Sequence, residues 1–128
     1  MSRVIVPFNL EPEPHGLRIA AVVSEWYRVD VTFLVPRTGY KVKTPDILMR
    51  GNEWEIKSPT KFSGSTIEQN LRKATSQSGW VILDTARLKE SDEFLLAVIA
   101  REAKMRKSLR KLIVVDKRGR VVEVFKRK

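Results

Sequence analysis

The stretch TPDILMRGNEWEIK, from Thr44 to Lys57, decides how the rest of the chain is interpreted. It predicts two short strands joined by a turn at Arg50-Gly51-Asn52. Because side chains alternate along a strand, Glu55 and Lys57 share one face, and the apolar residues beside them share the other. Asp46, at the start of the first strand, can reach the same charged face across the hairpin. Acids gathered with a lysine are costly to assemble without compensation, so the hairpin is the first candidate site.

The composition is that of one globular domain. The chain has 128 residues, of which 42% are apolar, and this suits a single domain with its own core. No apolar run is long enough to span a membrane, and the apolar segment at the start is too short for a secretory signal. The absence of cysteine excludes disulfides and thiolate metal sites, and it fits a site of action in a reducing cytoplasm.

The charge balance points to a polyanionic partner. Lysine and arginine total 25 against 15 aspartates and glutamates, which gives a formal net charge of +10. Such an excess favours nucleic acid first, and an anionic membrane or an acidic protein second. Solubility is the plainer explanation, but the basic residues are unevenly placed and crowd the segments 104–111 and 117–128.

Hydrophobic periodicity predicts an α/β domain that follows an N-terminal arm. The arm covers residues 1–15 and contains a Glu-Pro-Glu-Pro spacer, which resists helix and strand alike, and the domain covers residues 16–128. Predicted helices span 16–26, 65–76 and 91–107, with Ser65 and Glu68 as a capping box and Ser91 as an N-cap. Predicted strands are 29–35, the two strands of the hairpin, 80–83, 112–115 and 121–125. A basic connection from Tyr40 to Lys43 leads into the hairpin, and the sheet is mixed and flanked by helices.

The charged face of the hairpin suits phosphodiester chemistry. Asp46 and Glu55 converge from neighbouring strands and can hold a hard divalent cation, Mg²⁺ or Mn²⁺, through oxygen ligands. Such a cation polarises a phosphodiester and lowers the pKa of a bound water. Lys57 can orient the attacking water or stabilise the negative charge that develops on the phosphate. The alternative is a cross-strand ion pair, which contributes at most about 1 kcal/mol on an exposed face.

The same residues carry a resemblance to a known superfamily. Pro45-Asp46, eight intervening residues and then Glu55-Ile56-Lys57 resemble the signature of the PD-(D/E)XK nucleases. The predicted order of elements from Gly16 to Leu83 is similar to the αβββαβ core of that superfamily. The final helix and hairpin would then be a C-terminal addition to this core.

A narrower resemblance covers more of the chain. Several stretches are similar to the C-terminal toxin domain of contact-dependent growth inhibition proteins, a group of small nuclease domains that in several cases act on tRNA. These stretches are Glu25-Trp26-Tyr27, residues 31–34, residues 43–48, residues 54–59, residues 66–74 and residues 112–116. The resemblance implies a toxin that acts in the cytoplasm of a target cell, is delivered as part of a larger secreted protein, and is neutralised by an immunity protein.

The resemblance also implies roles for individual residues. Asp46 and Glu55 would be metal-ligating acids and Lys57 the catalytic lysine. Gln69 would occupy the position of a polar residue near the site. Members commonly add an acid from the first helix, where Glu25 is the available acid, and His15 just before that helix is the substitute.

The sequence also predicts a substrate and the residues that contact it. Lys61, Arg72 and Lys73 flank the predicted site and are candidate phosphate contacts. The leading reading is a metal-dependent nuclease acting on RNA, with tRNA favoured over DNA and with an acidic immunity protein as a further partner. A DNA endonuclease of the same fold, a nucleic-acid-binding module without catalysis, and a protein that docks an acidic partner are the alternatives.

Overall fold

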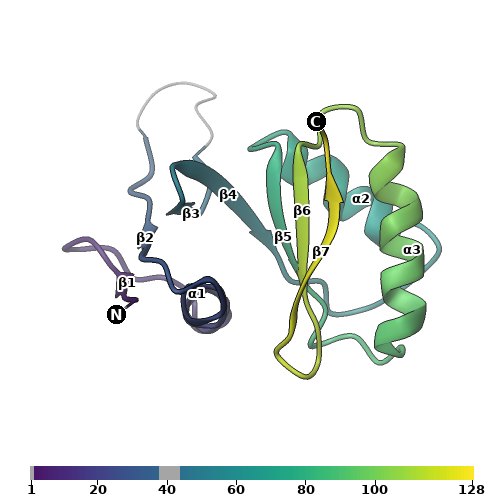
Figure 1. Ribbon diagram of the computed structural model, residues 1–128, viewed down its shortest axis with the longest axis horizontal. Helices are drawn as coiled ribbons and strands as arrows, with labels where there is room; N and C mark the ends of the chain where they lie inside the picture. The colour runs from purple at the N-terminus through teal and green to yellow at the C-terminus, as the bar shows by residue number, and fades with distance from the viewer. Residues whose placement is uncertain (1, 38–43) are drawn as a thin grey trace.

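A computed structural model describes residues 2–37 and 44–128. These residues form three helices and one seven-stranded sheet (Figure 1). The helices are α1 (Pro14–Tyr27), α2 (Thr66–Thr75) and α3 (Asp92–Lys104). The strands are β1 (Val4–Ile5), β2 (Val31–Phe33), β3 (Ile47–Met49), β4 (Asn52–Lys57), β5 (Trp80–Asp84), β6 (Lys111–Val115) and β7 (Val121–Lys126). The predicted fold class, a mixed α/β single domain, is confirmed.

Each strand of the sheet lies beside the strand that precedes it in the chain. The order is β1-β2-β3-β4-β5-β6-β7. The strands β2, β3 and β4 form an antiparallel meander, while β4, β5 and β6 are parallel and are joined through α2 and α3. The antiparallel hairpin of β6 and β7 closes one edge, and β1 pairs in parallel with β2 at the other.

The two faces of the sheet carry two separate hydrophobic cores. The first core packs α1, through Ile19 and Val23, against residues such as Trp54 and Ile82. The second core packs α2 and α3 against the opposite face, which includes Val81 and Leu83 of β5. Figure 1 shows the same arrangement, with α1 and the pair of α2 and α3 on different sides of the sheet. Side chains of β5 therefore alternate between the two cores. Because both faces of β5 are buried, its sequence is apolar.

The hairpin that the sequence predicts is present. Met49 pairs with Asn52, which leaves Arg50 and Gly51 as a two-residue turn. Both turn residues have positive φ, 55° and 81°, as expected for a tight turn that matches the twist of its strands. The Arg50 guanidinium lies over the Tyr27 ring, 4.3 Å from its centroid, so a cation–π contact joins the turn to the end of α1.

Of the predictions about where helices begin, one is confirmed and two are wrong. Ser65 does not form a capping box, because its backbone is not extended and its hydroxyl accepts a hydrogen bond from Gln69 instead of from the helix backbone. The predicted cap at Ser91 is confirmed, since its side chain accepts from the Phe94 amide at 3.2 Å. The first helix begins two residues early, at Pro14.

The arm and the first predicted strand also differ from expectation. The arm contains β1, a two-residue strand too short to give a periodic signal. β2 is only three residues long, and Val35, predicted to be part of it, is exposed. The predicted connection from Tyr40 to Lys43 lies outside the described residues. None of the helices formed by the described residues has the length and apolarity needed to cross a membrane.

Candidate active site

The candidate site forms where β4 extends beyond its partner β3. The last pair between the two strands is Ile47 with Trp54, so the edge of β4 from Glu55 onward has no strand on that side. Asp46 covers this edge. Its amide donates to the Trp54 carbonyl at 3.0 Å, and its carboxylate oxygen Oδ2 accepts from the Ile56 amide at 2.7 Å. The carboxylate of Asp46 therefore takes the place of a strand and is held against β4.

Glu55 is a buried acid that is only partly satisfied. Its side chain is 7% exposed, and Oε2 lies 3.4 Å from the Lys57 ammonium nitrogen. Its second oxygen, Oε1, has no hydrogen-bond partner among the described residues. Burial raises the pKa of Glu55 to about 7, and the negative charge of Asp46 adds to this, while Lys57 acts in the opposite direction. The predicted convergence of Asp46, Glu55 and Lys57 is thus present in the structure.

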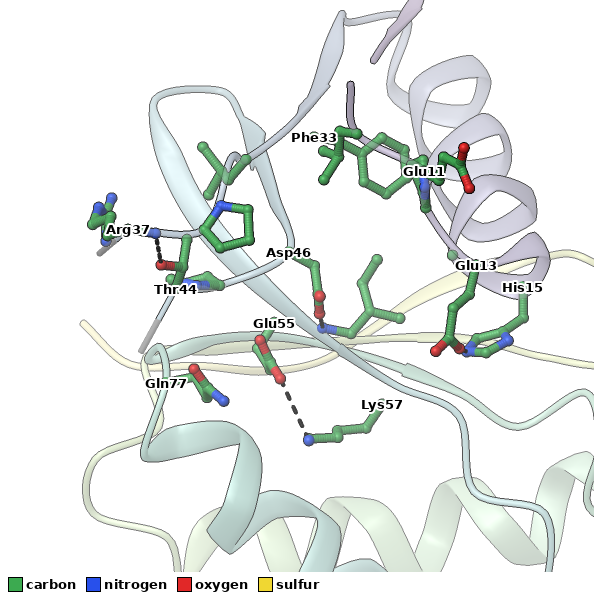
Figure 2. A pocket seen from close by; sticks show the side chains of 17 residues that line it. Glu11, Glu13, His15, Phe33, Arg37, Thr44, Asp46, Glu55, Lys57 and Gln77 are labelled. Atoms are coloured by element: carbon green, nitrogen blue, oxygen red, sulfur yellow. Dashed lines mark hydrogen bonds and ion pairs between the residues drawn. The ribbon is translucent and has the colours of Figure 1, made fainter. Parts of the chain in front are cut away.

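These three residues line a cavity of about 640 Å³ (Figure 2). One wall comes from the arm and the start of α1, between Leu10 and Gly16. The remaining walls come from the ends of β2 and β4, from residues 44–46, and from Gln77. The volume is in the range of small-molecule and substrate sites. Several chain segments that are distant in sequence therefore meet around the charged end of β4.

The lining of the cavity is acidic although the whole chain is basic. Among the described residues, four carboxylates line it, those of Glu11, Glu13, Asp46 and Glu55, against two permanent cations, Arg37 and Lys57. The balance is two minus four, or −2 with all four acids ionised and His15 neutral, whereas the chain as a whole carries +10. A polyanion drawn to the protein meets a cavity that repels it, unless a cation or a proton neutralises some of these acids.

The structure distinguishes between the two candidates for a fourth site residue. His15 lines the cavity, and its Nε2 lies 3.0 Å from a carboxylate oxygen of Glu13. Glu25 lies ten residues further along α1, about 15 Å along the helix axis. It borders a different hollow, together with Trp26 and Arg28. His15, and not Glu25, therefore lines the same cavity as the trio.

Gln69 does not reach the cavity. It is exposed on α2, and its amide nitrogen donates to the Ser65 hydroxyl at 3.0 Å. The cavity is lined instead by Gln77, just beyond the end of α2, which sequence reasoning missed. The segment that carries Gln77 is fastened to β4, because the Ser78 hydroxyl donates to the Glu53 carbonyl at 2.5 Å. A contact between residues 25 apart in sequence leaves no local pattern from which it could have been found.

The predicted phosphate contacts lie outside the cavity. Lys61, Arg72 and Lys73 are all exposed, and none of them lines the cavity. Arg72 lies 3.4 Å from Glu68 in an ion pair between successive turns of α2. These residues can meet only a substrate that extends well beyond the cavity.

The donor groups of the cavity suit a hard cation with few protein ligands. Among the described residues, no group of three or more histidine, aspartate or glutamate side chains is arranged to hold a metal. The pair of Asp46 and Glu55, with the free Oε1 of Glu55, nevertheless fits Mg²⁺. This ion usually keeps several waters and takes only one or two carboxylates.

Comparisons with known proteins identify the family. Residues 43–121, more than half of the chain, match the model for the contact-dependent growth inhibition CdiA C-terminal domain. A solved structure described as a CdiA-CT/CdiI toxin and immunity complex from Burkholderia pseudomallei contains a chain of similar fold. The TM-score is 0.66 at 16% identity, and the match covers 95% of this chain and 98% of that one. A search of curated proteins gives no match. The chain therefore belongs to the contact-dependent growth inhibition CdiA C-terminal domain family, and it is a bacterial toxin domain.

Proposed function

We propose that this toxin domain is a metal-dependent nuclease that cleaves phosphodiester bonds in RNA, with tRNA favoured over DNA. The observation that carries the proposal is the meeting of Asp46, Glu55 and Lys57 in one cavity of a strongly basic chain. The order α1-β2-β3-β4-α2-β5 supports a core of the PD-(D/E)XK type, in which these three residues would be the signature residues.

The electrostatics of the cavity support a role for a cation. The net positive charge draws RNA to the protein, but the acidic lining opposes a phosphate inside the cavity. Asp46 and Glu55 are the residues that would hold Mg²⁺ or Mn²⁺. The bound ion would neutralise charge at the scissile phosphate and activate water for attack.

The chain's own groups have complementary tasks. The Ile56 amide fixes one oxygen of Asp46, so this carboxylate enters the site already oriented. Lys57 places an ammonium within 3.4 Å of Glu55, where it can donate to a phosphate oxygen as negative charge develops. His15, paired with Glu13, also lines the cavity and is a candidate general acid or base.

A cleavage assay tests the function directly. Purified protein is incubated with total tRNA, and separately with plasmid DNA, in Mg²⁺, in Mn²⁺ or in EDTA. We expect tRNA fragments in either metal and none in EDTA. Cleavage that persists in EDTA would show that Glu55, His15 and Lys57 act without a metal. Cleavage of DNA alone would establish the alternative substrate.

A non-catalytic module would behave differently in the same assay. It would bind RNA with strong dependence on salt, cleave nothing in any metal, and be insensitive to EDTA. The variant Asp46→Asn distinguishes cleavage by this protein from cleavage by a contaminating nuclease. It should reduce the first and leave the products of the second unchanged. Asp30→Asn is the matched control, since Asp30 pairs with Arg3 beside β1 and takes no part in the cavity.

We also propose that the domain is delivered as part of a larger toxin and is neutralised by an acidic immunity protein. The family supports the first statement, and the complex to which the fold is similar contains an immunity protein. The basic surface supports an acidic partner. Co-expression with the product of the neighbouring gene should restore growth and yield a complex that weakens as salt rises.

A further inference from the structure

Gln77 is held at the cavity by contacts outside its own side chain. The backbone amide of Gln77 donates to the Ala74 carbonyl at 2.9 Å, which continues the last turn of α2. The next residue, Ser78, donates its hydroxyl to the carbonyl of Glu53 and accepts from the Trp80 amide at 3.0 Å. The backbone on either side of Gln77 is therefore fixed to α2 and to β4, and its side chain lines the cavity.

Two buried oxygen atoms in this cavity have no donor. These are Oε1 of Glu55 and Oε1 of Gln77, and neither has a hydrogen-bond partner among the described residues. In Figure 2 the end of the Gln77 side chain lies on the same wall of the cavity as the Glu55 carboxylate, with its amide nitrogen on the side of that carboxylate. Buried acceptors without donors are destabilising, and a positively charged or donating group placed between these two oxygens would satisfy both.

We propose that the side-chain oxygen of Gln77 is a further ligand of the divalent cation that Asp46 and Glu55 hold, an inference that rests on the proposed function. An amide oxygen is a neutral, hard ligand of the kind that Mg²⁺ and Mn²⁺ accept. It adds a third protein oxygen without adding negative charge to a cavity already at −2. The Glu55 side chain, 7% exposed with one oxygen unpaired, supplies the buried charge that the cation neutralises.

Cation binding to the protein alone tests this assignment. Isothermal titration calorimetry with Mn²⁺ and with Mg²⁺, in the absence of RNA, gives the Kd of the parent, Gln77→Leu and Gln77→Glu. We expect Gln77→Leu to weaken binding about tenfold. We expect Gln77→Glu to strengthen it about threefold or more, because a charged oxygen replaces a neutral one.

Thermal unfolding supplies an independent readout. In EDTA, Gln77→Glu should melt below the parent, since a third carboxylate joins Asp46 and Glu55. In saturating Mn²⁺ its Tm should rise by more than that of the parent. Asn70→Leu and Asn70→Asp are matched controls on α2, because the amide of Asn70 donates to the Thr66 carbonyl and does not line the cavity. Both controls should leave the Kd unchanged.

Three results would overturn the assignment. If the parent binds Mn²⁺ and Gln77→Leu binds it equally well, Gln77 is not a ligand although the proposed function stands. If Gln77→Leu lowers the Tm in EDTA without changing the Kd, the amide is turned round and its nitrogen donates to Glu55. If the parent binds neither cation and cleaves RNA in EDTA, the metal-dependent function and this ligand fail together.

Discussion

Glu55 and Asp116 are both buried acids, and their surroundings are opposite. Asp116 is 1% exposed and accepts hydrogen bonds from the backbone amides of Arg118 and Arg120 and from the Arg120 guanidinium. Burial alone would raise the pKa of Asp116, but these hydrogen bonds more than offset it and hold the pKa below its ordinary value. Glu55 has one cation beside it, a free oxygen and a raised pKa.

Asp84 resembles Asp116 and sharpens the contrast. It is fully buried and accepts from the Arg18 guanidinium at 2.5 Å, the Ser58 hydroxyl at 3.1 Å and the Ala86 amide at 3.0 Å. These contacts join the start of α1 to the ends of β4 and β5. A buried carboxylate with all its partners stabilises the fold, whereas one that lacks partners inside a cavity is available for a ligand.

The largest expected effect is on catalysis at the unsatisfied site. Lys57→Met and Asp46→Asn should each reduce the rate of RNA cleavage by about 10²–10³-fold, because each removes a group that acts on the transition-state charge. Single-turnover cleavage of tRNA measures the change, with the Tm recorded in parallel. Either variant cleaving at the parent's rate would exclude that residue from the site.

The satisfied acids should show the reverse behaviour. Asp84→Ala and Asp116→Ala should each lower the free energy of unfolding by about 2–3 kcal/mol, because they leave buried donors without acceptors. Urea denaturation followed by tryptophan fluorescence measures the loss. Cleavage measured well below the melting temperature should change little. A variant that is inactive yet fully stable would contradict the structural assignment of these acids.

The pH dependence of stability should separate the two kinds of acid. Glu55, with its pKa raised from 4.5 to about 7, binds more protons folded than unfolded between these values. The contribution of Glu55 to the free energy of unfolding therefore falls as pH rises from 4.5 to about 7, and it is constant above this range. Asp116, with a lowered pKa, stabilises the fold above its ordinary value of 3.8 and loses this contribution in acid.

Glu55→Gln isolates the contribution of Glu55 to this pH dependence. The Tm of the parent should decline between pH 5 and pH 7.5 relative to the variant, because the variant has no proton to lose there. Thermal melts at half-unit steps of pH, in EDTA, provide the measurement. Parallel pH profiles for the two proteins would show that Glu55 ionises normally.

The smallest expected effect compares two serines at helix starts. Ser91→Ala should destabilise the protein by about 1 kcal/mol, because it removes the acceptor of the Phe94 amide. Ser65→Ala should change stability by less than about 0.5 kcal/mol, since its hydroxyl contacts only the exposed side chain of Gln69. Equal losses at the two positions would mean that Ser65 caps α2 in solution.

Much of the fold follows from short-range patterns in the sequence. Alternation in the hairpin placed Glu55 and Lys57 on one face, and the turn signal at Arg50-Gly51-Asn52 located the hairpin that brings Asp46 to them, although Asn52 itself belongs to β4. β1 escaped prediction because two residues give no period, and it is a strand only because β2 pairs with it. Lys61, Arg72 and Lys73 were predicted to contact phosphate because they lie near the site in sequence. The direction of α2 does not bring them to the cavity.

The rest of the site depends on contacts that only the folded chain makes. Gln77 reaches the cavity because Ser78 is bonded to β4, and nothing near Gln77 in the sequence encodes that bond. The resemblance pointed to Gln69, which is exposed on α2, whereas Gln77 beyond the end of that helix lines the cavity. The pKa of Glu55 is likewise a property of burial and of Asp46, which approaches from the residues just before β3.

The order of the sheet has a consequence for how the chain reaches its native state. Every strand pairs with its predecessor, so each step of assembly closes one short loop or one helical crossover. Strands that are neighbours in the sheet are therefore also neighbours in the chain, which shortens the loops that sheet assembly must close. With no cysteine to pair, refolding also needs no oxidant.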